Sequence, residues 1–249
     1  MKDIAAVSRV KVSADGRGVV SHAGMGLLRE LADLTGLSSQ VTAVLADTYK
    51  GPWVYAPGAV FADLATAVAD GADCIDGVGQ LCADREHVFG AKASTTTMWR
   101  LVDERIDAAH LPKVREARAA ARAAAWAAGA APDPDQPLYI DVDATLVIDH
   151  SDNKAEAAPT WKKSFGHHPL LAFLDRPQIA GGEALAGLLR KGNAGSNTAA
   201  DHITVLDLAL ASLPADWRPT PDADDAEELS RPVDRGVSGD LRSGVLATV

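Results

Sequence analysis

Residues 138–147 read LYIDVDATLV. The alternation of apolar residues predicts a strand, and Asp141 and Asp143 would then project from the same face of it. A carboxylate buried among apolar side chains costs on the order of several kcal/mol unless a partner compensates for it. We therefore expect the pair at a strand end that reaches water, where the two carboxylates can share a divalent cation. The alternative is a strand end at which the aspartates only cap turns or face water.

Length and composition limit the class of protein. The chain has 249 residues, 47% of them hydrophobic, which is enough for the core of one large domain or two small ones. No apolar run reaches the roughly 18 residues that span a bilayer, and residues 1–18 lack the apolar stretch of a signal peptide. The two cysteines, Cys74 and Cys82, fit no zinc motif. These features predict a cytoplasmic protein without a membrane segment.

The net charge of −10 would disfavour binding to nucleic acid if it were evenly spread. It is uneven, because residues 98–130 carry 6 basic and 4 acidic residues, whereas residues 131–149 carry 0 and 5. Local patches matter more than the total for electrostatic binding. In the basic segment, an alanine-rich helix should place Arg115, Arg118 and Arg122 along one stripe. This stripe is either a face that tracks DNA phosphates or a solvated surface.

Residues 1–131 are predicted to form a helical, DNA-binding domain. Residues 25–36 have leucines at helical spacing and end in Gly36, which suits a C-terminal cap. A later helix should begin at Ser94, whose hydroxyl can cap it. The apolar residues expected to pack inward from these two helices are Leu27, Leu28, Leu31, Leu34, Met98, Leu101, Val102 and Ile106. Short helices joined by tight turns are typical of helix-turn-helix units, but also of ordinary helical bundles.

The sequence changes character after PDPDQP at 132–137, which marks a domain junction. Residues 138–213 are then predicted to form an α/β domain of three strands and a helix, so that the chain as a whole is α+β. The strands are expected in the apolar runs 138–148, 167–175 and 183–190, the third of which could instead be a short helix, and the helix at 198–213. Residues 214–249 are rich in Pro, Asp and Gly and are expected to be a disordered tail.

The acidic strand itself has one family resemblance. An apolar strand followed by Asp-x-Asp-x-Thr is the signature of haloacid-dehalogenase-like phosphatases, in which Asp141 would be the nucleophile and Asp143 the general acid, followed by Thr145. Such motifs normally open the domain, whereas 137 residues precede this one. The acidic pair that the family needs later would have to come from DADD at 222–225, within the expected tail. The phosphatase is therefore the weaker alternative.

A longer resemblance covers about residues 15–213. AAPTWKKSFGHHPLLAFLD at 157–175 and RKGNAGSNTAADH at 190–202 closely resemble DDE transposases of bacterial insertion sequences, in the group with a DDE domain of the first type. Upstream, FGAKASTTTMWRLVD at 89–103 is also similar. The resemblance implies a ribonuclease H-like catalytic domain, in which three antiparallel strands and a helix precede a fourth strand beside the first.

In such domains three carboxylates hold two divalent metal ions, here Mg²⁺, which activate water or a 3′-hydroxyl and stabilise the leaving oxygen. Asp143 is the best match to the first catalytic acid and metal ligand, and Asp141 is the second choice. The second acid should end the fourth strand, and a glutamate should follow. After residue 213 no apolar strand ends in a well-placed Asp, and no Glu-bearing helix follows. The tail therefore reads as a truncation or a change of frame, which leaves a partial catalytic domain.

The resemblance also implies double-stranded DNA, the ends of the element, as the partner. The residues expected to contact DNA from this domain are Lys162, Lys163, His168, Asn193 and Asn197. The lysines and the histidine could reach phosphates, Trp161 could stack on a base, and the backbone of the turn GNAGSN could approach the DNA backbone. The alternatives are solvated lysines, a tryptophan packed in the core, and a plain turn with glycines at positive φ.

Three functions follow from these patterns. The first is an insertion-sequence transposase that is catalytically incomplete because it lacks the second and third acids. The second is a non-catalytic DNA-binding inhibitor that acts on a full-length transposase, and the third is the phosphatase. For the transposase, a homo-oligomer or a complex with the full-length protein is expected. Without a fourth strand, residues 138–147 should form an exposed sheet edge that recruits another chain.

Overall fold

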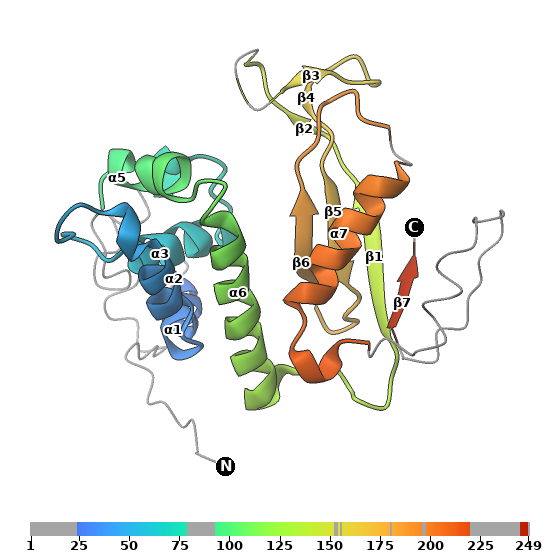
Figure 1. Ribbon diagram of the computed structural model, residues 1–249, viewed down its shortest axis with the longest axis horizontal. Helices are drawn as coiled ribbons and strands as arrows, with labels where there is room; N and C mark the ends of the chain where they lie inside the picture. Colours follow the sequence, from blue (N-terminus) through green and yellow to red (C-terminus); the bar gives the residue numbers. More distant parts are fainter. Residues whose placement is uncertain are drawn as a thin grey trace, which may run out of the picture. The chain divides into compact units, whose positions relative to one another are not determined.

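A computed structural model of the chain describes residues 24–78, 93–151, 154, 156–179, 181–195, 198–219 and 245–248. The chain divides into two compact units between Ala130 and Ala131 (Figure 1). The first unit is helical and the second contains two sheets and a long helix, so the fold is mixed α+β, as the sequence predicted. None of the described helices is long and apolar enough to cross a membrane.

The local sequence explains where the helices of the first unit begin and end. The main helices are α1 (Met25–Leu34), α2 (Leu37–Leu45), α3 (Pro57–Ala69), α5 (Thr95–Arg100) and α6 (Leu111–Ala125), with the short segments η1 (Ala46–Thr48), η2 (Leu101–Arg105) and η3 (Trp126–Ala130). Gly36 adopts φ 78° between α1 and α2, a left-handed conformation that favours glycine. Ser94 caps α5 as predicted, because its hydroxyl accepts a hydrogen bond from the Thr97 N–H at 3.3 Å.

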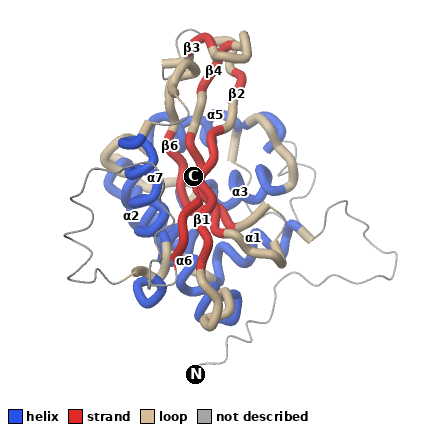
Figure 2. The backbone as a smooth tube through the Cα atoms, turned by 90° about the vertical axis from the view of Figure 1, so that its right-hand side faces the viewer, coloured by secondary structure: helices blue, strands red, loops and turns tan. Residues whose placement is uncertain are grey.

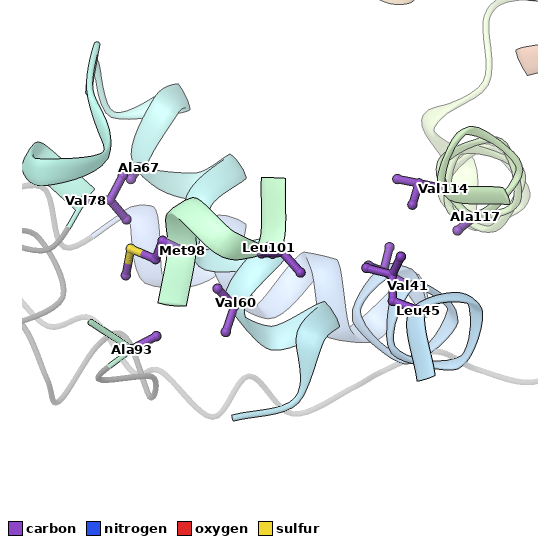
Figure 3. Packing of buried hydrophobic residues seen from close by; sticks show 10 residues of the cluster. All are labelled: Val41, Leu45, Val60, Ala67, Val78, Ala93, Met98, Leu101, Val114 and Ala117. Carbon is purple, nitrogen blue, oxygen red and sulfur yellow. The ribbon is translucent and has the colours of Figure 1, made fainter. Parts of the chain in front are cut away.

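The core of the first unit forms where α2 packs against α3 and α6 (Figure 3). Its buried cluster consists of Val41, Leu45, Val60, Ala67, Val78, Ala93, Met98, Leu101, Val114 and Ala117. Met98 and Leu101 are buried as predicted, whereas Val102 is 52% exposed, against the prediction. The close approach of α2 and α3 requires Gly58, because a Cβ there would lie 1.7 Å from the Ser38 carbonyl oxygen.

The face that α1 buries is not the one that its leucines predicted. The side chains of Leu27, Leu28, Leu31 and Leu34 are 40–48% exposed. The buried residues of α1 are Gly26 and Glu30 instead. From α1, Arg29 Nε donates to Asp63 Oδ1 on α3 at 2.6 Å, and Asp63 is fully buried. Burial raises the pKa of Asp63, and the hydrogen bond from Arg29 opposes that rise. An ion pair with α3 therefore orients α1 more than apolar burial does.

The second unit is built on a four-stranded sheet in the order β6-β5-β1-β7. Its strands are β1 (Leu138–Ala144), β5 (Leu170–Leu174), β6 (Glu183–Leu188) and β7 (Val245–Thr248). β5 pairs antiparallel with both β1 and β6. The apolar run at 183–190, for which the sequence allowed a strand or a short helix, therefore contains a strand. β7 runs parallel to β1, with Thr248 opposite Asp141. β1 therefore lies inside the sheet, and the expectation of an exposed edge was wrong.

Two ordered elements lie in the segment that was expected to be a disordered tail. One is β7, and the other is the 3₁₀ turn η4 (Ala215–Trp217). The expectation of disorder for residues 220–244 and for Val249 lies outside the described residues. β7 was missed because only four residues of the tail pair with β1, and so short an apolar run carries almost no periodic signal.

Helix α7 (Ala199–Ser212) covers one face of the sheet (Figure 1). On this side, Val205 and Ala209 of the helix are buried. The buried residues of β1 and β5 alternate along each strand and are Leu138, Ile140, Val142, Leu170, Ala172 and Leu174. Because side chains alternate along a strand, the residues between them project from the opposite face of the sheet.

The connection from β1 to β5 contains a second sheet that the sequence analysis did not predict. It consists of β2 (Val147–Ile148), β3 (Ala158–Pro159) and β4 (Phe165–His167) in the order β2-β4-β3. Both views place it beyond the C-terminal end of β1 (Figures 1 and 2). Gly166 lies in its central strand, where a Cβ would be 2.1 Å from the Val147 carbonyl oxygen. The tight pairing of β4 with β2 therefore requires a glycine at this position.

Candidate functional site

Asp141 and Asp143 project from the face of β1 that α7 does not cover. Both residues are exposed, as is Tyr139 on the same face, and their neighbours across the ladder on β5 are Phe173 and Leu171. The two carboxylates therefore keep their contact with water, and the desolvation cost of a buried pair does not arise. They stand side by side on the second strand from one edge of the sheet, next to β7.

The C-terminal end of β1 holds Asp143 in a defined position. Its Oδ1 accepts a hydrogen bond from the Ala144 N–H at 2.8 Å. The next residue, Thr145, donates its N–H to the Pro169 carbonyl at 3.1 Å, which ties the strand end to the start of β5. Carboxylate oxygens are the ligands that Mg²⁺ prefers. Within the described part of the chain, however, no group of three or more His, Cys, Asp or Glu side chains could hold a metal ion.

A hairpin between β3 and β4 carries the lysines predicted to contact DNA. Thr160 and Ser164 close its turn, because the Thr160 N–H donates to the Ser164 carbonyl at 2.8 Å and their hydroxyl oxygens lie 2.6 Å apart. Trp161, Lys162 and Lys163 are exposed between them. Trp161 is 70% exposed, and Lys162 Nζ lies 5.0 Å from the centre of its ring. The turn therefore presents one aromatic ring and two positive charges to solvent.

Arg190, which the sequence analysis did not single out, fastens the segment after β6 to this hairpin region. Its Nε donates to the His168 carbonyl at 2.9 Å, and its Nη1 donates to the Gly195 carbonyl at 2.9 Å and to Asp201 Oδ2 at 3.0 Å. The His168 N–H donates back to the Arg190 carbonyl at 3.1 Å. The available signal was the pair of basic residues, Arg190 and Lys191, directly after the apolar residues 184–189.

The turn GNAGSN depends on glycine for close approach. A Cβ on Gly192 would lie 2.2 Å from the Ala158 carbonyl oxygen and 2.5 Å from that of Gly166. Neither Gly192 nor Gly195 adopts a positive φ, so the alternative of positive-φ glycines was wrong. The backbone of the turn thus rests directly against β3 and β4.

The hairpin and this turn together line a pocket of about 470 Å³. Its lining residues are Pro159, Thr160, Trp161, His168, Asn193, Ala194 and Gly195. Two residues predicted to contact DNA, His168 and Asn193, therefore meet at one pocket, with Lys162 and Lys163 on the adjoining turn. Asn197 lies outside the described residues. Asp141 and Asp143 are not among the lining residues, so the acid pair and the pocket are two separate features of the second unit.

The predicted basic stripe lies in the first unit, on α6. One side of this helix is buried through Val114, Ala117 and Ala121. Arg118 is exposed, and Arg115 and Arg122 are half-buried. The pKa of Arg118 is lowered, first because surrounding protein atoms desolvate its guanidinium although the residue as a whole is exposed, and then by the positive charges of Arg122 and Arg115. The three guanidinium groups therefore act on one another, and an anion bound along the stripe would relieve their repulsion.

Acidic side chains on an inner strand and basic side chains on exposed turns are the groups that a metal-dependent DNA-processing protein requires. Comparison with protein families agrees with this class: the family model for the transposase DDE domain group 1 matches residues 2–221. The chain belongs to this family of transposases. The family acts on DNA and generally uses divalent metal ions. No curated protein and no solved structure was found to match the chain.

Proposed function

We propose that the chain binds the DNA ends of an insertion sequence during transposition, and that Asp143 supplies its first catalytic carboxylate with Asp141 beside it. The observation that carries this proposal is the position of the two acids. They share the exposed face of β1, between β5 and the parallel strand β7, in a chain of the transposase family. The order of the strands and the helix supports a ribonuclease H-like arrangement, because three antiparallel strands and α7 precede a strand parallel to β1.

In this proposal the basic residues bind and orient the DNA. Lys162 and Lys163 neutralise phosphates from the hairpin, and the arginine stripe of α6 gives the first unit its own phosphate contacts. Asp143 and Asp141 would hold a divalent ion, which when bound supplies activation of water or a 3′-hydroxyl. Two carboxylates are the right kind of donor but too few for a two-ion site. The remaining ligands must come from DNA, from residues outside the described ranges or from a second chain.

A second candidate is a non-catalytic DNA-binding partner of a complete transposase. It is favoured by one observation: the described residues gather no third acid beside Asp141 and Asp143. Such a chain would occupy the element's ends, or assemble with a full-length transposase, without cutting the strand. The phosphatase alternative has no comparable support, because the family match covers both units of the chain.

Broadening of amide NMR signals by Mn²⁺ tests the role of Asp143 without requiring catalysis. We expect Mn²⁺ to broaden signals from β1 and from the facing residues of β5. Asp143→Asn should prevent this, whereas Asp207→Asn, which changes an exposed aspartate of α7, should not. Broadening that persists in Asp143→Asn would contradict the assignment.

A nicking assay on supercoiled DNA that carries the element's ends then separates the two candidates. Mg²⁺-dependent nicking that Asp143→Asn abolishes supports an active transposase. DNA binding without nicking supports the non-catalytic partner. Nicking by Asp143→Asn at the wild-type rate would show that the catalytic acid lies elsewhere.

A further inference from the structure

The pocket beside the hairpin combines an aromatic wall with groups that form hydrogen bonds. Trp161 contributes an indole that is 70% exposed, and Pro159 and Ala194 add apolar surface. Asn193 contributes a side-chain amide, which offers both donors and acceptors. The volume, about 470 Å³, lies within the range of roughly 300–1,000 Å³ that is typical of small-ligand sites. A flat, polar, aromatic group is the chemistry that such walls accommodate.

The hydrogen-bonding state of His168 is set by its contact with the turn at 192–195. Its Nδ1 lies 2.7 Å from the Ala194 carbonyl oxygen, which can only accept, so Nδ1 carries a proton. In the neutral ring Nε2 is then an acceptor. His168 is itself only 4% exposed, so its ring cannot turn away to solvent. The pocket therefore offers a fixed imidazole together with the amide of Asn193.

The walls of the pocket are held in place before any ligand arrives. Arg190 binds the carbonyls of His168 and Gly195, which both line the pocket, and is anchored in turn to Asp201 of α7. Gly192 allows the turn to rest against β3 and β4. A site that is already formed loses less entropy on binding than one that must be ordered.

The charges around the pocket indicate what the flat group is attached to. None of the described residues that line the pocket is a lysine or an arginine, so these residues offer a phosphate no charged partner inside it. Lys162 and Lys163 are exposed on the turn that carries Trp161, directly outside. A nucleotide within a DNA strand fits this arrangement, because its base can enter the pocket while its phosphates stay outside, near the lysines. Bases in a duplex are paired and stacked, so only an unpaired base can enter.

We propose that this pocket binds one unpaired nucleobase of a single-stranded DNA segment that adjoins the bound duplex. The base stacks on Trp161 and meets His168 and Asn193, while Lys162 and Lys163 bind the flanking phosphates. This proposal rests on the proposed function, because it assumes that the chain binds DNA. It adds a discrimination between single-stranded and duplex DNA that the acid pair on β1 does not provide.

Fluorescence anisotropy with the full chain tests the proposal. The probes are a blunt 20-base-pair duplex and the same duplex with a five-nucleotide single-stranded overhang. We expect the overhang probe to bind about tenfold more tightly, in line with base–aromatic stacking. Trp161→Ala should reduce the ratio of the two affinities to about one. The matched variant Trp99→Ala, which removes an indole that is 48% exposed in the first unit, should leave the ratio at about ten.

A fluorescent base analogue gives a second readout. 2-Aminopurine at one overhang position should be quenched on binding to the wild-type chain, and Trp161→Ala should remove that quenching. Asn193→Ala should lower the affinity ratio as well. Equal binding of both probes by the wild-type chain, or a ratio that Trp161→Ala does not change, would overturn the pocket proposal and leave DNA binding intact. Failure to bind either probe at low salt would instead overturn the proposed function.

Discussion

Arg190 and Asp201 join the turn after β6 to the first turn of α7, with 3.0 Å between Nη1 of the arginine and Oδ2 of the aspartate. The side chain of Arg190 is only 5% exposed, whereas that of Asp201 is 31% exposed. A negative charge in the first turn of a helix is also favoured by the helix dipole. The same guanidinium holds the carbonyls of His168 and Gly195, so one side chain connects β6, α7 and the pocket.

Arg190→Met should therefore destabilise the second unit. Methionine keeps the apolar stem but removes the donors to two carbonyls and to Asp201, so we expect the free energy of unfolding to fall by about 2–4 kcal/mol. Urea denaturation followed by circular dichroism measures this change. Arg100→Met, at an arginine that is largely exposed on α5, is the matched control. A change below about 0.5 kcal/mol in Arg190→Met, as at ordinary surface positions, would contradict the role of this residue.

Gly58→Ala should disrupt the packing of α2 on α3. The added Cβ would lie 1.7 Å from the Ser38 carbonyl oxygen, so the helices must separate, and the Gly58 N–H would lose its 3.0 Å hydrogen bond to Thr42 Oγ1. We expect a loss of about 1–3 kcal/mol in the free energy of unfolding. Gly51→Ala is the control, because a Cβ there meets nothing within 4 Å. Equal stability of the two variants would show that the helices adjust without cost.

The stability of the first unit should depend on pH through His110. Its Nδ1 lies 2.7 Å from Asp107 Oδ1, and its Nε2 lies 3.0 Å from Asp47 Oδ1. The hydrogen bond to Asp107 raises the pKa of His110 above its ordinary 6.5, and the same bond lowers the pKa of Asp107 below its ordinary 3.8. The histidine's contribution is complete below pH 6.5 and is lost as the pH rises through its raised pKa.

The aspartate's contribution is complete above pH 3.8 and is lost as the pH falls through its lowered pKa. The interaction is therefore strongest between these two limits. Thermal melting midpoints at about pH 5.5 and pH 8.5, on either side of an ordinary histidine pKa, should differ more in the wild type than in His110→Gln. The same pH dependence in both proteins would show that the contacts of His110 with Asp107 and Asp47 do not stabilise the first unit.

DNA binding by the chain should weaken steeply with salt. Replacing Arg115, Arg118 and Arg122 by alanine should reduce the slope of log affinity against log salt by about 2–3, because each phosphate contact contributes about 0.9. Anisotropy titrations of a duplex over a range of salt concentrations provide the slopes. Arg100→Ala, on a different helix, should change the slope little. An unchanged slope in the triple variant would mean that the stripe is only a solvated surface.

Patterns that repeat over a few residues predicted much of the secondary structure. The period of two in β1 placed Asp141 and Asp143 on one face, as the structure has them. Gly36 and Ser94 were expected at helix ends and are found there, because capping depends on local backbone geometry. Family membership was also predicted correctly from short motifs, because a motif of consecutive residues can be recognised without knowledge of the fold.

The helical pattern of α1 shows where such reasoning fails. Amphipathic spacing indicates that four leucines share a face, but it does not indicate which face meets the core. The ion pair between Arg29 and Asp63, 34 positions apart, turns the helix so that Glu30 is buried. The candidate pocket was missed for a similar reason, because Trp161 and Asn193 belong to turns that meet only in the folded chain.

The sequence by itself determined the features that depend on neighbours along the chain: the strand that carries two aspartates, the helix caps and the transposase motifs. Only the tertiary structure decided which of these residues lie together. His168 meets Ala194 over 26 positions, Arg190 meets His168 over 22, and β7 reaches β1 from the far end of the chain. These contacts depend on burial and on hydrogen bonds that form only when distant segments pack together. The periodic patterns of the sequence therefore do not predict them.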